Sequence, residues 1–346
     1  MKPIRVLHLV GSPTSPQHQE LSVLYADGCM AALHQPAKYD FQIALVKPGG
    51  VWCFPKSLTV KDIEAAPPML GDAAIAQLAL AKIDLVLPQM FCLAGMTTYR
   101  ALLDVLAIPY LGNRPFQMAL TADKAKAKAV VSAAGVRVPR GELLEIGAKP
   151  TLLPPVVVKP NNSDNSDGVT FVQDQAGYEA ALELAFAFSD TVLVEQYVPL
   201  GREVRCGIVV QKGRLRHLPL EEYFVDTAIR PVRTRADKLK RDSDNNLVLA
   251  AKQASEAWIV DAADPVVPAV WHAASLCHTA LGCEQYSLFD FRIDPDGVPW
   301  FLEAGLYCSF SPKSVLATMM AAGGTPLPVF FDQAVEQLLR PVDGDS

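Results

Sequence analysis

Residues 287–293, SLFDFRI, and residues 298–304, VPWFLEA, decide the fold of this chain. Both stretches are rich in aromatic and aliphatic residues, and the Pro-Asp-Gly turn between them predicts a β-hairpin. Alternate residues of a strand face the same way, so Leu288, Asp290 and Arg292 share one face. Counting back through the turn places Glu303 opposite Asp290 on the neighbouring strand.

The pair formed by Asp290 and Glu303 indicates a metal site. Two adjacent carboxylates repel each other unless a cation lies between them. Mg²⁺ is held by one or two carboxylates together with substrate phosphates. The aromatic neighbours Phe289 and Phe301 favour burial of the hairpin. The alternative interpretation is a surface hairpin with scattered charges.

A lysine at the end of an apolar strand gives the second signal. Residues 156–160 read VVVKP and are followed by a small polar turn, NNSDNSDG, at residues 161–168. Such a turn can set the Lys159 ammonium and several backbone N–H groups around phosphates. The chain has no Gly-x-x-x-x-Gly-Lys-Ser/Thr loop, so the site is of another type. The alternative is an ordinary hairpin loop with a solvated lysine.

A third signal is the apolar strand VLVEQYV, residues 192–198, which runs into Gly-Arg-Glu at residues 201–203. Its end could present backbone groups to an adenine edge and Glu203 to ribose hydroxyls, or it is simply a strand end. On a helix expected at residues 117–134, Lys124 and Lys128 are four residues apart and share a face. A solvated helix face is the alternative for these lysines.

A fifth segment, residues 309–314, opens another helix. Free N–H groups at the start of a helix attract anions. Helix capping alone would also explain Ser311 and Pro312.

The composition of the chain excludes several classes of protein. With 346 residues, half of them hydrophobic, the chain can bury a large core in two or three modules. A net charge of −6 argues against a nucleic-acid partner, and no apolar run is long enough to span a membrane. The seven cysteines are scattered and contain no Cys-x-x-Cys pair, which is typical of reduced thiols in the cytoplasm.

The order of predicted elements divides the chain into three domains. In residues 1–115, strands alternate with helices, which predicts a parallel sheet with ligand sites beyond the carboxyl ends of its strands. Residues 116–199 read as a small α+β module, and residues 200–346 as a second one with antiparallel strands. A charged stretch at residues 221–246 is expected to be a functional or mobile loop.

The order and spacing of these motifs resemble the ATP-grasp superfamily, and most closely the D-alanine–D-alanine ligases and related amino-acid ligases. The resemblance extends over nearly the full chain. It implies a Rossmann-like N-terminal domain and two α+β modules that clamp ATP. It also implies Mg²⁺, with Mn²⁺ as a substitute, and a homodimer acting on a small-molecule carboxylate and amine.

The resemblance implies a role for each motif residue. For the nucleotide, the implied residues are Lys124 and Lys159 at the phosphates, Asn165, Ser166 and Gly168 in a mobile phosphate lid, Glu195, Gln196 and Val198 around adenine, and Glu203 at the ribose. For the chemistry, they are Asp290 and Glu303 as ligands of two Mg²⁺ ions and Ser314, with Lys313 beside it, at a substrate carboxylate.

The chain departs from the family pattern in the metal hairpin. The asparagine expected two residues after the metal glutamate is Gly305, so another group or water must complete the coordination. The arginine expected two residues before the metal aspartate, which in the family stabilises the tetrahedral oxyanion, is Leu288. Arg292 lies on the same strand face and is the candidate replacement.

Other departures lie on the substrate side. His18 replaces a substrate-binding glutamate near the N-terminus, although Glu20 and Ser22 fit the pattern nearby. The His-Gly pair expected after the third strand is absent, and Gln89 and Met90 stand there. The phosphate loop also lacks the glutamate-glycine-serine-serine form of the family.

These expectations lead to an acid–amine ligase that forms an amide bond through an acyl phosphate and releases ADP. The acid would be an amino acid or a derivative from a specialised pathway, and the amine would give a dipeptide or close a ring. D-alanine–D-alanine ligation is an alternative within this class. The alternatives outside it are a regulatory nucleotide-binding protein without activity and a small-molecule binder without nucleotide. In the ligase, Arg230, Arg233 and Arg235 are expected to help the segment 221–246 close over the substrates.

Overall fold

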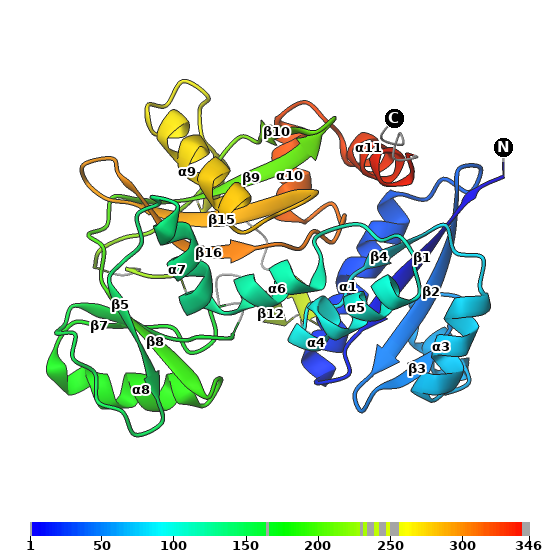
Figure 1. Cartoon of the computed structure of the whole chain (residues 1–346), viewed down its shortest axis with the longest axis horizontal. Coiled ribbons are helices and arrows are strands. Elements are labelled where there is room, and N and C mark those ends of the chain that lie inside the picture. Colours follow the sequence, from blue (N-terminus) through cyan, green and yellow to red (C-terminus); the bar gives the residue numbers. More distant parts are fainter. Residues whose placement is uncertain are drawn as a thin grey trace.

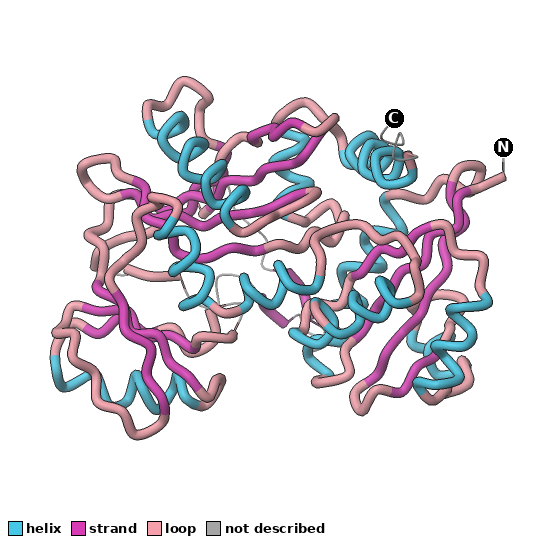
Figure 2. The backbone as a smooth tube through the Cα atoms, viewed as in Figure 1, coloured by secondary structure: helices cyan, strands magenta, loops and turns pink. Residues whose placement is uncertain are grey.

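The computed structural model describes residues 2–163, 166–228, 231–233, 239–241, 247–249 and 256–340, with residues 239–241 and 247–249 described by their backbone only. The described chain forms two four-stranded sheets, one six-stranded sheet and one two-stranded ribbon. Each of the three larger sheets is covered by helices, and the three lie apart from one another in Figures 1 and 2. The prediction of an α/β part followed by α+β parts is confirmed.

The N-terminal sheet has the strand order β3-β2-β1-β4. Its strands are β1 (Ile4–Gly11), β2 (Tyr39–Lys47), β3 (Val51–Cys53) and β4 (Leu85–Pro88). β1 pairs in parallel with β2 and β4, as the alternation of strands and helices predicts, while β3 is an antiparallel edge. The accompanying helices are α1 (Pro16–Ala32), α2 (Val60–Ala65), α3 (Gly71–Leu80), α4 (Leu93–Met96) and α5 (Thr98–Val105).

The central sheet is antiparallel, with the order β5-β8-β6-β7. Its strands are β5 (Gly141–Glu145), β6 (Val156–Pro160), β7 (Thr170–Val172) and β8 (Thr191–Gln196). The short 3₁₀ helix η1 (Gln175–Gly177) and the helix α8 (Tyr178–Phe186) pack on one face of the sheet through an aliphatic core. This module forms the separate lobe at the lower left of Figure 1.

The six-stranded sheet runs β14-β11-β9-β15-β16, with β10 added on β9. Its strands are β9 (Arg202–Gln211), β10 (Arg214–His217), β11 (Glu221–Tyr223), β14 (Ala257–Ile259), β15 (Tyr286–Ile293) and β16 (Pro299–Gly305). β12 (Leu239–Arg241) and β13 (Leu247–Leu249) pair only with each other. The helices are α9 (Val266–Ala280), α10 (Val315–Ala322) and α11 (Leu327–Leu339).

The hairpin of β15 and β16 pairs Asp290 with Glu303, as predicted from the sequence. A register irregularity follows directly after Asp290. Phe289, Phe291 and Phe301 are fully buried beneath the sheet in the core that includes α9. The apolar face therefore anchors the hairpin while the opposite face presents the two carboxylates.

Three expected elements differ in the structure. The helix expected at residues 117–134 is two helices, α6 (Pro115–Ala122) and α7 (Lys124–Ala133), because Asp123 leaves the helical conformation and caps α7 through the N–H of Lys126. The helix expected to be capped by Ser311 begins at Val315, with Ser314 as its N-cap. The stretch 221–246, expected as a loop, contains the strand β11, which completes hydrogen bonds along β9.

The packing of α7 differs from the predicted domain division. The division places this helix with the central module, but Ala127 and Val131 lie in the core of the six-stranded sheet. The lysines of α7 are therefore attached to the large sheet, and the helix contacts the central module through the side chains of Lys124 and Lys128 and through backbone N–H groups that donate to Asn161.

The last helix, α11, packs against the N-terminal sheet. Phe330 and Phe331 of α11 share a core with Val6 and Tyr39 of the N-terminal sheet. The Tyr39 hydroxyl donates to Asp332 Oδ1 at 2.6 Å. In Figure 1, α11 lies at the same end of the molecule as the start of β1.

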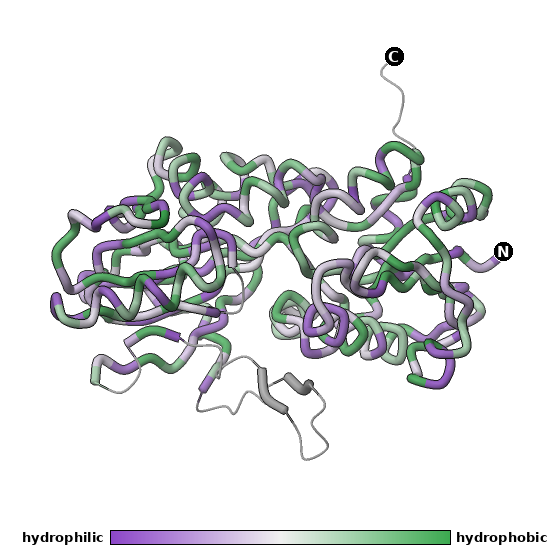
Figure 3. Tube along the Cα trace, turned by 90° about the horizontal axis from the view of Figure 1, so that it is seen from below, coloured by the Kyte–Doolittle hydropathy of each residue, from purple (hydrophilic) through white to green (hydrophobic). Residues whose placement is uncertain are grey.

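No single helix in the described ranges is long and apolar enough to cross a membrane, although α10 and α11 would pass by composition if their 105° bend were ignored. Figure 3 shows hydrophilic and hydrophobic stretches interspersed along each part of the described chain. None of the seven cysteines forms a disulfide, and six of them are buried, as predicted.

Candidate active site

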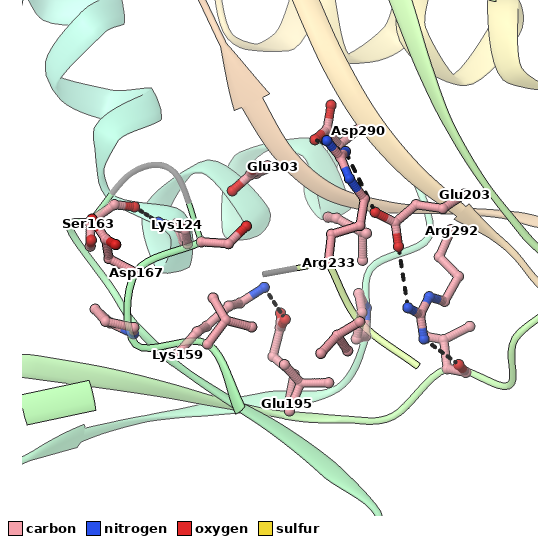
Figure 4. Close-up of a pocket in the computed structure, with 18 of the residues that line it drawn as sticks. Lys124, Lys159, Ser163, Asp167, Glu195, Glu203, Arg233, Asp290, Arg292 and Glu303 are labelled. Carbon is pink, nitrogen blue, oxygen red and sulfur yellow. Dashed lines mark hydrogen bonds and ion pairs between the residues drawn. The ribbon is translucent and has the colours of Figure 1, made fainter. Parts of the chain in front are cut away.

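A pocket lies between the central sheet and the six-stranded sheet. It encloses about 770 Å³, open solvent at its mouth included. Figure 4 shows its charged side chains pointing toward a common space from opposite sides. The polar lining comes from seven segments far apart in the sequence: Lys124, Lys159, Ser163, Ser166, Asp167, Glu195, Gln196, Glu203, Arg233, Asp290, Arg292 and Glu303. Pockets of this size hold small ligands and cofactors.

One wall of the pocket is a buried cluster of one acid and two lysines. Glu195 of β8 lies 2.7 Å from Lys128 Nζ and 2.5 Å from Lys159 Nζ. Burial lowers the pKa of Lys128 to about 8, against the opposing charge of Glu195. Although burial alone would raise it, the two lysines hold the pKa of Glu195 below its ordinary value. The cluster carries a net positive charge toward the pocket.

The loop after β6 is tied to the start of α7. Asn161 accepts from the N–H of Ala125 at 2.9 Å and donates to Asp123 at 3.0 Å. Lys124 Nζ donates to the carbonyl of Ser163 in the same loop. Figure 4 shows this contact beside the side chains of Asp167 and Lys159. The loop and the helix start therefore present cations and polar groups as one unit.

Gly168 ends this loop in a conformation that favours glycine. Its φ is +70°, and an added Cβ would come within 2.8 Å of Pro160 Cγ and 2.9 Å of Phe188 Cδ2. A side chain here would force the loop away from β6, so the position is restricted both by conformation and by space.

The opposite wall is the face of β9, β15 and β16. The pairing of these strands sets Arg205, Asp290 and Glu303 in one row. Arg205 donates to both oxygens of Asp290, from Nε to Oδ1 and from Nη2 to Oδ2, the latter at 2.8 Å. Beside Glu303, an added Cβ at Gly305 would meet no atom within 4 Å. Space for a further ligand group therefore remains next to the acids.

A second row on this face, Glu203 with Arg292, lines the other end of the pocket. Arg292 Nη2 lies 3.2 Å from Glu203 Oε2 and 2.7 Å from the carbonyl of Pro231, and Nη1 donates to Val198 O at 3.2 Å. Arg233 Nη1 lies 3.8 Å from Glu203 and 3.9 Å from Asp290. Its guanidinium carbon is 3.5 Å from the centroid of the Tyr223 ring, a stacked cation–π contact.

The donor set fits a nucleotide with its metal. Arg292 Nε is buried and makes no hydrogen bond among the described residues. Unsatisfied buried groups in a pocket indicate a ligand that satisfies them. Among the described residues no group of three His, Cys, Asp or Glu could hold a metal by itself. Two carboxylates suit Mg²⁺ when phosphates complete its coordination.

Comparison with known proteins identifies the family. Residues 144–340, more than half of the chain, match the family model described as D-ala D-ala ligase C-terminus. The chain belongs to this family. It is 30% identical over 249 residues to the D-alanine–D-alanine ligase of Synechococcus sp., covering 70% of each chain. The ligase of Geobacter sulfurreducens is 28% identical over 315 residues, covering 86% of this chain and 89% of the relative.

Solved structures with the same fold cover almost the whole chain. The VanG D-Ala:D-Ser ligase of Enterococcus faecalis superposes with a TM-score of 0.78 at 21% identity, covering 98% of this chain and all of that one. The D-alanine–D-alanine ligase of Bacillus anthracis complexed with ATP gives 0.71 at 20% identity, with 97% and 98% covered. The predicted ATP-grasp fold is confirmed.

Membership of the D-alanine–D-alanine ligase family confirms the predicted class of reaction, an ATP-dependent carboxylate–amine ligase that forms a C–N bond, releases ADP and acts on small molecules. ATP and Mg²⁺ are the cofactors of the family, as predicted. The regulatory protein without activity is not favoured.

The structure brings most of the predicted nucleotide residues together. Lys124, Lys159, Ser166, Glu195, Gln196, Val198, Glu203, Asp290, Arg292 and Glu303 all line the pocket. Ser314 and Lys313 lie outside its lining, at the start of α10, where Ser314 is buried and Lys313 is exposed. Asn165, Arg230 and Arg235 lie outside the described residues. Arg292 lines the pocket and faces Glu203, in the row on the opposite side of Asp290 from Leu288, and its role as the replacement arginine stays a prediction.

Two charged residues of the site were not predicted. Lys128 was recognised only as sharing a helix face with Lys124. Its burial against Glu195 of the central module cannot be predicted from helical spacing. Arg205 was missed, although it stands two residues after Glu203 and so shares its strand face. Strand alternation could have found Arg205, but its pairing with Asp290 depends on which strand lies next to β15.

Proposed function

We propose that this ligase joins two small amino acids into a dipeptide, with D-alanine as the acid that is activated. The proposal rests on the convergence of Lys124, Lys159, Asp290 and Glu303 from separate elements on one pocket, as seen in Figure 4. The curated relatives, which are D-alanine–D-alanine ligases, support D-alanine as the acid.

In the proposed reaction, a carboxylate oxygen of the first amino acid attacks the γ-phosphorus of ATP and ADP leaves. The amine of the second amino acid then attacks the acyl carbon, phosphate leaves with the C–O bonding pair, and the amine releases its proton. Lys124 and Lys159 would neutralise phosphate oxygens, and Asp290 and Glu303 would hold Mg²⁺. Mg²⁺ supplies charge neutralisation at the transferred phosphoryl group.

At the other end of the nucleotide, Glu195, whose carboxylate pairs with Lys128 and Lys159, would line the adenine. Glu203 would accept from the ribose hydroxyls, and Arg292 would hold Glu203 in place while its unsatisfied Nε finds a partner. The start of α10 would receive the substrate carboxylate, because Ser314 is an N-cap whose side chain caps no backbone N–H.

Two departures from the family pattern, His18 and Gln89, lie on the substrate side. His18 contacts Ser15 Oγ at 2.8 Å within the cap of α1. Gln89 contacts His8 at 2.8 Å and donates to Ser309 O at 2.7 Å. Both side chains are already engaged in the framework, so we infer that they shape the substrate space rather than bind an ammonium group directly.

The test is ADP release in the presence of MgATP and pairs of amino acids. D-alanine, D-serine, glycine and their L-counterparts are supplied alone and in pairs, and products are weighed by mass spectrometry. We expect turnover that requires D-alanine and a product with the mass of a dipeptide. A ring product from one substrate would replace this proposal, and nucleotide binding without turnover for any pair would end it.

We also infer that the ligase acts in the cytoplasm as a homodimer. The seven free cysteines support a reducing compartment, and the dimer rests on the family resemblance alone. Light scattering should give twice the chain mass of 37.4 kDa. A mass of one chain at micromolar concentration would contradict the dimer.

A further inference from the structure

Strand β9 carries an arginine that the nucleotide pocket does not use. Arg205 lies directly opposite Asp290, and both of its hydrogen bonds among the described residues go to that carboxylate. A two-point fork of this kind fixes the plane and position of a carboxylate. The Arg205 side chain remains 15% exposed, so a small ligand can still reach it.

Arg205 lies beside Asp290 on the neighbouring strand but does not line the nucleotide pocket. Asp290 itself lines the pocket. Three rows follow one another along the strands. Glu203 and Arg292 form the row at the nucleotide, Arg205 and Asp290 form the next, and Gly207 and Leu288 form the third.

The row of Gly207 and Leu288 is covered by α10. An added Cβ at Gly207 would come within 2.8 Å of Leu316 and 2.9 Å of Met319. Arg205 is thus one row away from the helix whose first residues include Ser314, the proposed carboxylate site.

Tyr25 of helix α1 lies within electrostatic reach of Arg205. Burial raises the pKa of Tyr25 to about 12, and the positive charge of Arg205 opposes this rise. The guanidinium therefore lies close enough to Tyr25 for its charge to act there. Its carbon is also 5.4 Å from the centroid of the Tyr223 ring on β11. Arg205 is consequently bordered by Asp290 on one side and by the Tyr223 ring of β11 on another.

The two other arginines that the structure describes in this part of the site already have partners. Arg292 is held by Glu203 and two carbonyl groups, and Arg233 stacks on Tyr223 at the nucleotide side. Position 288, two residues before the metal aspartate, is a leucine buried in the apolar core with α10. Yet negative charge accumulates here when a carboxylate approaches ATP and again when the amine attacks.

We propose that Arg205 neutralises this negative charge: it holds Asp290 with one edge of its guanidinium and contacts the reacting carboxyl group with the remainder. It thereby takes over, from the neighbouring strand, a task that Leu288 cannot perform. The inference rests on the proposed ligase function. It assigns to β9 a role in the acid end of the reaction, in addition to its nucleotide contact through Glu203.

The experiment compares Arg205→Met and Arg205→Lys with Arg202→Met. Arg202 is the matched control, because it stands on the same strand and pairs with two acids, Glu222 and Asp264, without lining the pocket. Two quantities are measured: the Mg²⁺ affinity of the ADP complex by calorimetry, and kcat and KM for D-alanine-dependent ADP release.

In Arg205→Met, we expect Mg²⁺ affinity to be unchanged or a few-fold higher, because the metal no longer shares Asp290 with a guanidinium. We expect kcat to fall by about 10²–10³, the range for loss of a positioned charge at a developing oxyanion. Arg205→Lys should recover about a tenth of the wild-type rate, since it keeps the charge and loses the fork. Arg202→Met should change both quantities by less than about two-fold.

Two results would overturn the proposal. Equal losses of Mg²⁺ affinity and kcat in Arg205→Met would show that Arg205 only holds Asp290, and an unchanged kcat would remove it from the reaction. If the methionine variant does not fold, Arg205→Lys decides by the same criterion. Wild-type turnover with D-alanine is established first, so failure of the ligase function is seen separately from failure of Arg205.

Discussion

At the scale of single residues, the hairpin of β15 and β16 has room for a side chain at Gly305. Gly305 follows Glu303 by two residues, and a side chain there would enter open space without a strained φ. In Gly305→Asn an amide oxygen comes within reach of the metal site. We expect the Mg²⁺ affinity of the ADP complex to rise about three- to ten-fold, since oxygen ligands are what Mg²⁺ prefers.

Calorimetric titration of Mg²⁺ checks the Gly305→Asn prediction. Gly305→Ala is the matched control, because it adds the same Cβ without a ligand atom, and it should leave the affinity unchanged. Equal affinities for the two variants would mean that the space beside Glu303 does not belong to the metal site.

The buried acid Glu195 provides a second residue-scale prediction. Its loss leaves Lys128 and Lys159 buried with like charges, because each of them pairs with Glu195 at 2.5–2.7 Å. In Glu195→Leu we expect the free energy of unfolding to fall by about 3–5 kcal/mol, the usual penalty for breaking a buried ion pair. Urea unfolding measures this loss. Glu145→Leu, at the exposed end of β5, should change it by less than about 0.5 kcal/mol.

At the scale of elements, the loop between β6 and β7 depends on a crowded glycine. In Gly168→Ala the added methyl group would collide with Pro160 and Phe188, which displaces the loop that presents Ser163 and Ser166 to the pocket. We expect the KM for ATP to rise about ten-fold while the rest of the fold persists. Gly147→Ala is the control, because Gly147 also has a positive φ but no atom within 4 Å of the added Cβ.

Steady-state kinetics with varied ATP checks the Gly168→Ala prediction, and circular dichroism checks the fold. Gly147→Ala should leave the KM for ATP unchanged and reduce stability by about 1 kcal/mol, from backbone strain alone. Equal effects of the two variants on KM would show that crowding at residue 168 does not position the loop.

The elements also show what could be predicted from the sequence. The pairing of Asp290 with Glu303 followed from strand alternation and turn length, which are local properties, and the structure has that register. The break between α6 and α7 was missed, because the Ala- and Lys-rich sequence on both sides of Asp123 was interpreted as one helix, although Asp123 caps α7 through the N–H of Lys126. The strand β11 was missed because its residues, Glu221–Tyr223, are polar and become buried only by pairing with β9 and β14.

The residues of the site also fall into two groups, those recognisable from the local sequence and those whose roles depend on distant segments. Residues that belong to sequence-local motifs, such as Lys159 and Asp290, were recognised by their own neighbours. Lys128 and Arg205 acquire their roles from Glu195 and Asp290, which lie on other strands. A side chain whose function depends on the neighbouring strand cannot be assigned until the order of strands in the sheet is known.

At the scale of the whole molecule, a chain of hydrogen bonds connects β1 of the N-terminal sheet with Ser309, in the segment before α10. His8 of β1 contacts Gln89 Oε1 at 2.8 Å, and Gln89 donates to Ser309 O at 2.7 Å. His8 is fully buried, its ring contacts Phe41 edge-on at 4.8 Å, and its Nε2 has no hydrogen-bond partner. A charged imidazolium at this position would lack a partner for its second N–H.

A second buried histidine behaves in the same way. His278 of α9 is 4% exposed and contacts Ser287 Oγ at 2.8 Å. Burial lowers the pKa of both His8 and His278 from 6.5 to about 4. Each histidine is therefore neutral in the folded protein at a pH where the unfolded chain already binds a proton.

Stability should consequently fall as the pH drops below 6.5, and this loss should level off near pH 4. In this window the unfolded chain binds more protons than the folded protein, so acid favours unfolding. At about 1.4 kcal/mol per pH unit, each histidine removes about 2 kcal/mol between pH 6.5 and pH 5. Urea unfolding at pH 7 and pH 5 measures the loss. In His8→Leu the loss should be smaller by about 2 kcal/mol, whereas His34→Leu, at an exposed site, should retain it in full. An unchanged loss in His8→Leu would mean that His8 takes up its proton without unfolding, and that the polar chain from β1 to Ser309 accommodates the charge.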